Sequence, residues 1–345
     1  MGKRIEWLDF AKGFAIFFVV FGHAVEYIFP ENTGNNVAHI IIYSFHMPFF
    51  FMLSGIVFSD KKYSSFKKFF KKKFCTLIIP SYIFLIVPIL IGRIKSVMNW
   101  GESVPINKKS VIRTILQFRI EMIANYWFLP ALFFALIIMW CVHRVFKSNT
   151  HRVIVSIFLA VIGAAYICVI AKPLPFSIDN AILVYVFMEI GYQIKDKLTQ
   201  IKGKYNIIIV VLALIWIVSA VVNYKYFGEQ SISLAYVTLL NPVLFFISAI
   251  SGSIFCLLLC NKIGNAPGIN CWGNNTLVIY WLSGSVLSPF IGWLNKYDIK
   301  NGFLSLAICL IVSLVVIEIT NTISIMIKRY CPYILGMKNN NKNMK

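Results

Sequence analysis

The chain has 345 residues, of which 59% are hydrophobic and 13% are charged. Soluble globular chains are typically about 45–50% apolar, so the composition excludes an ordinary soluble protein and predicts an integral membrane protein. The 33 basic residues outnumber the 13 acidic ones and give a net charge of +20. Because the basic residues lie between apolar segments, the positive-inside rule explains this excess better than binding to nucleic acid does.

Apolar segments long enough to cross a bilayer, which takes ~20 residues, follow one another along the chain. We predict an all-α, polytopic protein with about ten transmembrane helices, near residues 10–29, 37–58, 74–92, 126–143, 153–171, 181–194, 205–222, 234–260, 276–294 and 303–327. Asn241-Pro242 is expected to kink or break the eighth of them. Residues 1–330 would form a single transmembrane domain, followed by a polar tail at 331–345.

The basic residues also predict the orientation of the chain in the membrane. If the N-terminus is cytoplasmic, the segments on the cytoplasmic side hold 23 of the 33 basic residues. Both termini are therefore predicted to be cytoplasmic.

The eight cysteines lie mostly inside apolar segments and show neither a CxxC pair nor a His/Cys cluster with zinc spacing, so we expect packing roles and no metal.

The first apolar segment carries charges that a simple membrane anchor would not need. In WLDFAKGFAIFFVVFGHAVEYIFP, residues 7–30, the ionisable residues are Asp9, Lys12, His23 and Glu26. Each ionisable group in hydrocarbon costs ~2.5–3.5 kcal/mol on insertion scales. Lys12 and His23 are eleven residues apart, so they share a helix face and lie ~16 Å apart along the axis. We predict that this stripe faces protein or a water-filled cavity and that His23 is a general acid or base.

The second apolar segment adds His39 and His46, seven residues or two helical turns apart. Counted from the outer surface, His46 and His23 reach comparable depths, so the two side chains can approach each other. Histidine titrates near neutral pH and is a common general acid or base. We take His46 as a second catalytic candidate, whereas His39 is better explained as a hydrogen-bonded packing residue.

Two stretches, RIEWLDFAKGFAIFFVVFGH at 4–23 and SFHMPFFFMLSG at 44–55, resemble the acyltransferase-3 family of integral membrane O-acyltransferases. The closer likeness is to its fucose 4-O-acetylase-like and surface-polysaccharide O-acetyltransferase branch. Lys12 and His23 match the family hallmark of a basic residue, ten residues and a histidine, and Arg4 and Asp9 also match. The segments YWFLPALFF (126–134) and GNNTLVIYWLS (273–283) are similar to later family segments.

The chain departs from this resemblance at two positions. Relatives usually have histidine at the position of Ser283, so any role of that histidine is lost or moved here. They often have arginine at the position of Lys73, and lysine keeps the charge but not the bidentate geometry for phosphate.

The resemblance implies an enzyme that moves an acetyl or other short acyl group from cytoplasmic acetyl-CoA to a sugar hydroxyl. The acceptor would be a cell-surface or exported polysaccharide, free or lipid-linked, and the enzyme a multi-pass protein of a bacterial plasma membrane. The resemblance further implies catalytic roles for His23, His46 and Asp9, and donor binding by Arg4, Lys12 and Lys73.

Several alternatives stay open at this point. The lysine-rich run at 61–73 is either a topology signal or an attractor for the phosphates of coenzyme A. Asp9 or Glu26 would tune the electrostatic field around His23. The acyl group would pass directly to the acceptor or rest first on His46 or Ser54. Weaker candidates are Glu189 and Glu318, which would line the cavity or pair with basic residues near the cytoplasmic rim. Asn275 and Tyr280 would orient an acceptor or satisfy neighbouring backbone groups.

A proton-coupled transporter or flippase of a small solute or glycolipid is the alternative class of protein. Polar stripes, intramembrane histidines and a broken eighth helix also suit transport. Paired broken helices in matching halves, a hallmark of such transporters, are not found in the sequence, and a purely structural role leaves the polar stripe unexplained. We therefore expect an enzyme.

Overall fold

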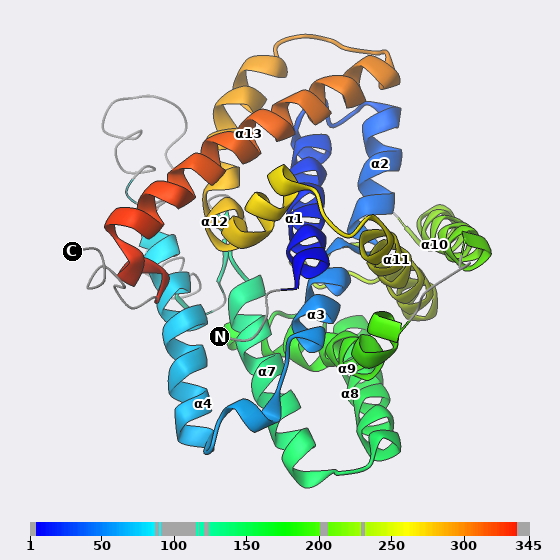
Figure 1. Ribbon diagram of the computed structural model, residues 1–345. Helices are drawn as coiled ribbons and strands as arrows, with labels where there is room; N and C mark the ends of the chain where they lie inside the picture. The colour runs from blue at the N-terminus through cyan, green and yellow to red at the C-terminus, as the bar shows by residue number, and fades with distance from the viewer. Residues whose placement is uncertain are drawn as a thin grey trace. The chain divides into compact units, whose positions relative to one another are not determined.

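Helices dominate the part of the chain that the structure describes (Figure 1). The computed structural model describes residues 5–86, 90, 115, 116, 118–120, 124–200, 206–228 and 232–336. The α-helices are α1 (Glu6–Tyr27), α2 (Thr33–Tyr43), α3 (His46–Ile56), α4 (Phe66–Lys73), α7 (Phe128–Val145), α8 (Asn149–Ile170), α9 (Ile178–Gln200), α10 (Asn206–Phe227), α11 (Pro242–Ile263), α12 (Pro267–Leu294) and α13 (Gly302–Tyr330). The short elements are η1 (Asp60–Lys62), η2 (Phe74–Ile78), η3 (Pro175–Ser177), η4 (Pro332–Leu335) and an antiparallel pair of strands, β1 (Arg119–Ile120) and β2 (Ala124–Asn125).

Among the described residues, eight helical segments are long and apolar enough to cross a membrane. They are α1, the stretch of α2 and α3, α7, α8, α10, α11, α12 and α13. The prediction of a helical, multi-pass membrane protein is thereby confirmed. The predicted span 74–92 lies partly outside the described residues, and the predicted span 181–194 is α9, which is not among the eight. The number of ten spans and the cytoplasmic termini stay predictions.

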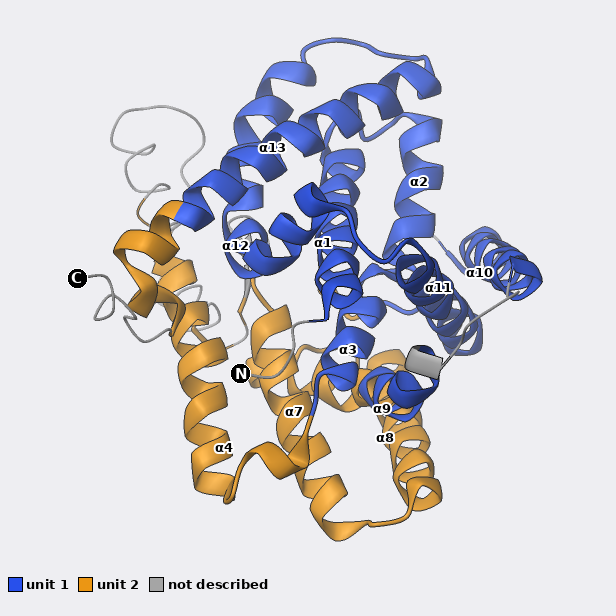
Figure 2. Ribbon diagram, in the orientation of Figure 1, with its two compact units in different colours: residues 1–58, 187–233, 238–325 blue, residues 59–186, 234–237, 326–345 orange. Residues whose placement is uncertain are grey.

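The chain divides into two compact units, which Figure 2 colours separately. Unit 1 contains residues 1–58, 187–233 and 238–325, and unit 2 contains residues 59–186, 234–237 and 326–345. Each unit thus combines stretches that are far apart in the sequence. A single domain over 1–330 stays a prediction, and most of the predicted polar tail lies outside the described residues.

The predicted break at Asn241-Pro242 is confirmed, because α11 begins at Pro242. The side chain of Asn241 accepts a hydrogen bond from the backbone N–H of Leu244, 3.1 Å away, and so caps the helix. Proline suits the first turn of a helix because its missing N–H would have no intrahelical partner there. The residues before the break form a turn that is held by a bridge between Ser233 and Thr238.

The second predicted span is not one continuous helix, as its hydropathy suggested, but the two helices α2 and α3. The interruption falls at Ser44 and Phe45, and Pro48 explains it: a proline ring clashes with the carbonyl four residues earlier, here that of Ser44. Packing fixes the break in place. Trp216 of α10 donates a hydrogen bond from Nε1 to Ser44 Oγ at 2.8 Å, and its ring contacts that of Phe45.

Two helix crossings in unit 1 are so close that only glycine fits. A Cβ at Gly13 of α1 would lie 1.9 Å from the carbonyl oxygen of Ile269, and a Cβ at Gly273 of α12 would lie 1.8 Å from that of Asp9. Gly55 of α3 and Gly191 of α9 meet in the same reciprocal way. Small residues that let backbones approach closely are typical of helix contacts in membranes.

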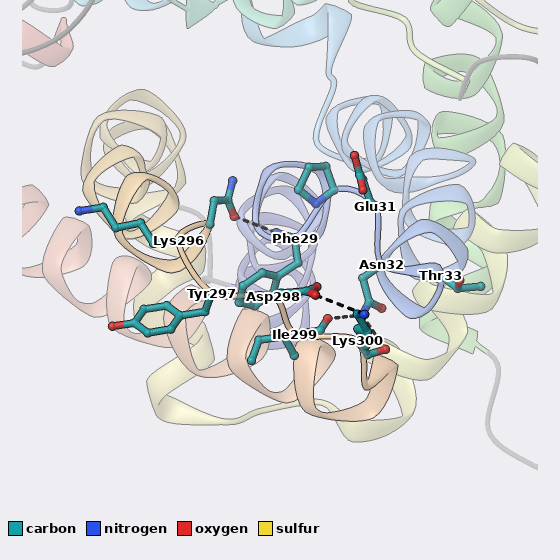
Figure 3. A pocket seen from close by; sticks show the side chains of 11 residues that line it. Phe29, Glu31, Asn32, Thr33, Lys296, Tyr297, Asp298, Ile299 and Lys300 are labelled. Carbon is teal, nitrogen blue, oxygen red and sulfur yellow. Dashed lines mark hydrogen bonds and ion pairs between the residues drawn. The ribbon is translucent and has the colours of Figure 1, made fainter.

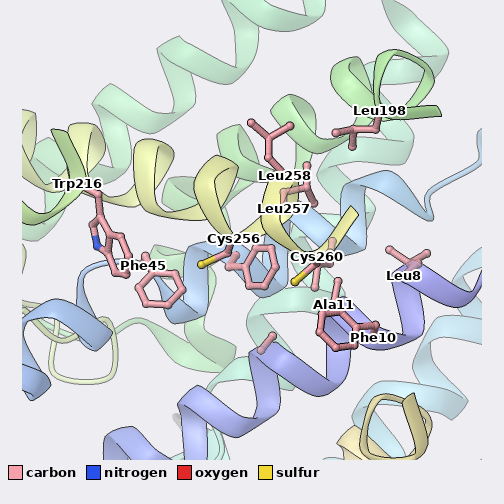
Figure 4. Packing of buried hydrophobic residues seen from close by; sticks show 13 residues of the cluster. Leu8, Phe10, Ala11, Phe45, Leu198, Trp216, Cys256, Leu257, Leu258 and Cys260 are labelled. Atoms are coloured by element: carbon pink, nitrogen blue, oxygen red, sulfur yellow. The ribbon is translucent and has the colours of Figure 1, made fainter. Parts of the chain in front are cut away.

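Unit 1 also contains a cluster of buried hydrophobic side chains, shown in Figure 4. Phe10 and Ala11 of α1 pack there near Phe45 at the start of α3, together with side chains of α10 and α11. Cys256 and Cys260 are buried in this core, as expected of packing cysteines. The core thus fixes α1 against the helices that surround it.

We expect Gly273→Ala to destabilise the protein, because the new Cβ would overlap the backbone of α1. Overpacking typically costs about 1–3 kcal/mol, and here a backbone would have to move. Gly284→Ala is the matched control on the same helix, since nothing lies within 4 Å of its Cβ position. The thermal unfolding midpoint of purified protein should fall for Gly273→Ala and stay unchanged or rise for Gly284→Ala. Equal midpoints for the two variants would contradict the close crossing.

Candidate active site

Helix α1 carries the polar stripe without interruption. It is regular from Glu6 to Tyr27, so the separation of ~16 Å between the Cα positions of Lys12 and His23 follows from the helix rise. The stripe is divided into two groups. Asp9 and Lys12 form an ion pair at 3.3 Å near one end, and His23 Nδ1 lies 3.3 Å from the Glu26 carboxylate near the other end.

Tyr43, the last residue of α2, completes the second group. Its hydroxyl lies 3.0 Å from His23 Nδ1 and donates a short hydrogen bond to Glu26 Oε2. His23 Nδ1 lies 3.3 Å from the same carboxylate oxygen. The three side chains therefore form a closed hydrogen-bonded triangle, in which every edge is one of these contacts.

The triangle assigns the tautomer of His23. The hydroxyl proton of Tyr43 goes to Glu26, so the hydroxyl oxygen and the carboxylate both remain as acceptors toward Nδ1. With Glu26 ionised and the imidazole neutral, this pattern has the hydrogen on Nδ1 and the lone pair on Nε2. A carboxylate that binds Nδ1–H orients the imidazole and stabilises the imidazolium that forms when Nε2 accepts a proton. The arrangement is that of a positioned general base.

The other two histidines of the second span gather around Tyr43. The ring centroids of His39 and Tyr43 are 3.9 Å apart, and those of Tyr43 and His46 are 4.8 Å apart. His46 is buried, and its Nδ1 lies 2.8 Å from the carbonyl oxygen of Ile42, to which it donates. Neither His39 nor His46 contacts His23 directly in these pairs; both support the tyrosine that does.

Three further residues were predicted for the site, namely Asp9, Arg4 and Lys73. Asp9 is ~21 Å from His23 along the helix axis, so it accompanies the cation Lys12 and not the histidine. Arg4 lies outside the described residues. Lys73 ends α4 in unit 2, where burial and the nearby charges of Lys62 and Lys72 lower its pKa to about 8.

The weaker polar candidates have hydrogen-bond partners of their own. Gln193 donates to Glu189 at 2.5 Å, and the indole of Trp272 donates to Glu318 at 2.8 Å. Asn275 donates to Asn321 at 2.7 Å, in a buried group between α12 and α13. These hydrogen bonds give the three residues a structural role, because they connect neighbouring helices or successive turns of one helix.

Tyr43 was missed by sequence reasoning, although two signals pointed to it. It lies four residues after His39 and three before His46, so all three share a helical face. Pro48 also marks the break that ends α2 at Tyr43.

Among the described residues there is no group of three or more His, Cys, Asp or Glu side chains that could hold a metal ion.

The fold and this site define a polytopic membrane protein with a positioned histidine inside its helices, and comparison with known proteins gives the class. The acyltransferase domain family matches residues 5–320, so the chain belongs to this family. The resemblance noted in the sequence is thereby confirmed.

Two curated relatives are similar over part of the chain. Nodulation protein NolL of Mesorhizobium japonicum is 29% identical over 188 residues, which are 53% of this chain and 46% of that protein. Nodulation protein NolL of Sinorhizobium fredii is 29% identical over 133 residues, which are 36% of this chain and 32% of that protein. The chain thus matches less than half the length of these relatives. No solved structure matches it.

We expect Glu26→Gln to slow acyl transfer about 10- to 100-fold, because a hydrogen bond to a charged group contributes about 1.5–3 kcal/mol. Tyr43→Phe removes a neutral partner of Nδ1 and should slow transfer about 2- to 10-fold. Tyr226→Phe, on an exposed stretch of α10, is the matched control. Initial rates of purified variants, normalised to folded protein, give the comparison. Wild-type rates in both site variants would show that the triangle does not serve the reaction.

Proposed function

We propose that this chain is a membrane O-acetyltransferase. It moves an acetyl group from acetyl-CoA, bound from the cytoplasmic side, to a sugar hydroxyl of a cell-surface or exported polysaccharide. The observation that carries the proposal is the triangle of His23, Glu26 and Tyr43, which leaves Nε2 of an intramembrane histidine as a base. Membership of the acyltransferase family supplies the reaction class.

In the proposed reaction, Nε2 of His23 takes the proton of the acceptor hydroxyl as its oxygen attacks the thioester carbonyl. A carbon–oxygen bond forms and the carbon–sulfur bond breaks. The imidazolium then returns the proton to the departing thiolate, so coenzyme A leaves as a thiol. Glu26 stabilises the positive ring in between, because its carboxylate accepts from Nδ1.

Direct transfer is proposed over an acyl-enzyme. The two candidate acyl carriers are both engaged with backbone carbonyls of their own segment: Ser54 Oγ donates to Phe50 at 2.9 Å, and His46 Nδ1 donates to Ile42 at 2.8 Å. His23 has both a carboxylate and a tyrosine hydroxyl as partners of its Nδ1, which suits it to act as the base for direct transfer.

Lys12 is proposed to meet the phosphates of the donor. It lies on the same helix as the base, ~16 Å away, a distance that the extended pantetheine arm of coenzyme A would have to cover. A lysine ammonium binds phosphate as a point charge. Asp9 beside it, at 3.3 Å, keeps this cation paired when no donor is bound.

The activity itself is tested with purified protein in lipid nanodiscs. Acetyl-CoA labelled in the acetyl group is incubated with extracted surface glycan, and label in the glycan is measured. Incorporation supports the enzyme, and release of free coenzyme A should match it. Solute uptake by sealed vesicles in the absence of any incorporation would favour the transporter instead.

His23→Ala should reduce transfer by about 10²–10⁴-fold, the usual effect of losing a positioned general base. The amount of folded protein in the membrane should not change. His39→Ala is the comparison variant: its ring packs against that of Tyr43, with centroids 3.9 Å apart, and we expect a mild effect. Near-normal transfer by His23→Ala would remove the base from the proposal and leave His46 as the candidate.

Lys12→Arg should keep much of the activity, whereas Lys12→Ala should keep little, because a cation is the required property at this position. The loss should appear as a raised KM for acetyl-CoA, with the KM for the acceptor unchanged. Steady-state kinetics with each substrate varied in turn separates the two. A raised KM for the acceptor instead would show that Lys12 does not serve the donor.

A further inference from the structure

A polar cavity of about 580 Å³ lies in unit 1, beyond the end of α1 that carries His23 (Figure 3). Two loops line it: residues 29–33, which join α1 to α2, and residues 295–300, which join α12 to α13. Both loops lie at the opposite end of α1 from Lys12. The cavity is not part of the triangle described above.

Two asparagines tie the loops together and make the cavity a defined site. Asn295 accepts a hydrogen bond from the backbone N–H of Phe29 at 2.9 Å and donates to the carbonyl of Tyr27 at 2.9 Å. The buried Asn32 donates to the carbonyl of Ile299 at 2.9 Å (Figure 3). Its side-chain oxygen accepts a hydrogen bond from the backbone N–H of Gly34. A ligand would therefore meet loops that are already ordered, which lowers the cost of binding.

The charges around the cavity balance. Glu31 and Asp298 supply two carboxylates, and Lys296 and Lys300 supply two ammonium groups. A site for an anionic ligand would carry an excess of cations, and this one does not. Sugar hydroxyls both donate and accept hydrogen bonds, so they suit a lining in which donors and acceptors alternate.

The position of the cavity relates it to the base. Tyr27, the last residue of α1, lies ~6 Å along the axis from His23, and its carbonyl accepts a hydrogen bond from Asn295, which lines the cavity. Glu26, whose carboxylate lies in the triangle, precedes the first lining residue by only three. A molecule that occupies the cavity and extends toward α2 would therefore bring an adjoining hydroxyl toward Nε2.

We infer that this cavity is an acceptor subsite that binds an uncharged saccharide unit next to the one that is acylated. The inference rests on the proposed function and adds to it the place and the charge of the acceptor. Glu31 and Asp298 accept hydrogen bonds from sugar hydroxyls, and Lys300 donates to them. The exposed ring of Tyr297 offers an apolar face to the sugar ring.

The experiment measures binding and transfer with Glu31→Gln and Asp298→Asn. Each substitution removes hydrogen bonds between a sugar hydroxyl and a charged carboxylate. It should therefore raise the KM for the glycan acceptor about 10- to 100-fold and leave the KM for acetyl-CoA unchanged. Both variants should fold, because the loops are held by Asn32 and Asn295. Asp60→Asn in unit 2 is the matched control, with unchanged values for both substrates.

Saturation-transfer NMR adds a readout that does not depend on catalysis. The probes are methyl glycosides of neutral hexoses, a hexuronic acid methyl glycoside and glycerophosphocholine. Signals from the neutral glycosides that weaken in the Glu31→Gln and Asp298→Asn variants support the subsite, even if no acyl transfer is found and the proposed function fails. Active variants with an unchanged acceptor KM, or binding of the uronic acid or of glycerophosphocholine alone, would overturn it.

Discussion

Helix α1 is held along its whole length by α12, and the candidate site depends on this contact. In the middle, Gly13 and Gly273 let the two backbones meet at distances that no other residue would allow. At the two ends, asparagines of α12 bind carbonyls of α1: Asn270 donates to Glu6 at 3.1 Å and Asn295 to Tyr27 at 2.9 Å. The helices therefore run in the same direction, and α1 cannot slide or turn without breaking these contacts.

The same direction of α1 and α12 agrees with the order of the predicted spans. The first and ninth spans, both odd in number, would cross the membrane in the same sense. Local reasoning also located the polar stripe, because a helical period of 3.6 residues puts Lys12 and His23 on one face. It located the start of α11 too, because proline is a strong signal whatever its tertiary surroundings.

Other features were beyond the reach of sequence reasoning, for physical reasons. The span 37–58 was treated as one helix because hydropathy averages over the break that Pro48 imposes at Ser44. The partner of His23 was sought among charges on α1, whereas Tyr43 comes from the neighbouring helix. The cavity between residues 29–33 and 295–300 depends on a contact between segments more than 260 residues apart, and no local period encodes such a pairing.

The division of the stripe into two pairs reduces the cost of placing it within a membrane helix. Asp9 and Lys12 are oppositely charged partners three residues apart, and Glu26 is hydrogen-bonded to His23, also three residues away. Between the pairs, α1 presents a ladder of aromatic rings in which Phe14 contacts Phe18, and Phe17 contacts Phe21. The charges are therefore confined to the two ends of the helix, separated by an apolar middle.

The cation and the base share one uninterrupted helix, so their separation is a property of covalent geometry and not of packing. Inserting one residue between Lys12 and His23 would rotate one against the other by about 100°. Inserting four would restore the face to within about 40° but lengthen the span by ~6 Å. Under the proposed function, this part of the chain cannot change its length, because the number of residues between Lys12 and His23 sets the reach required of the acyl carrier.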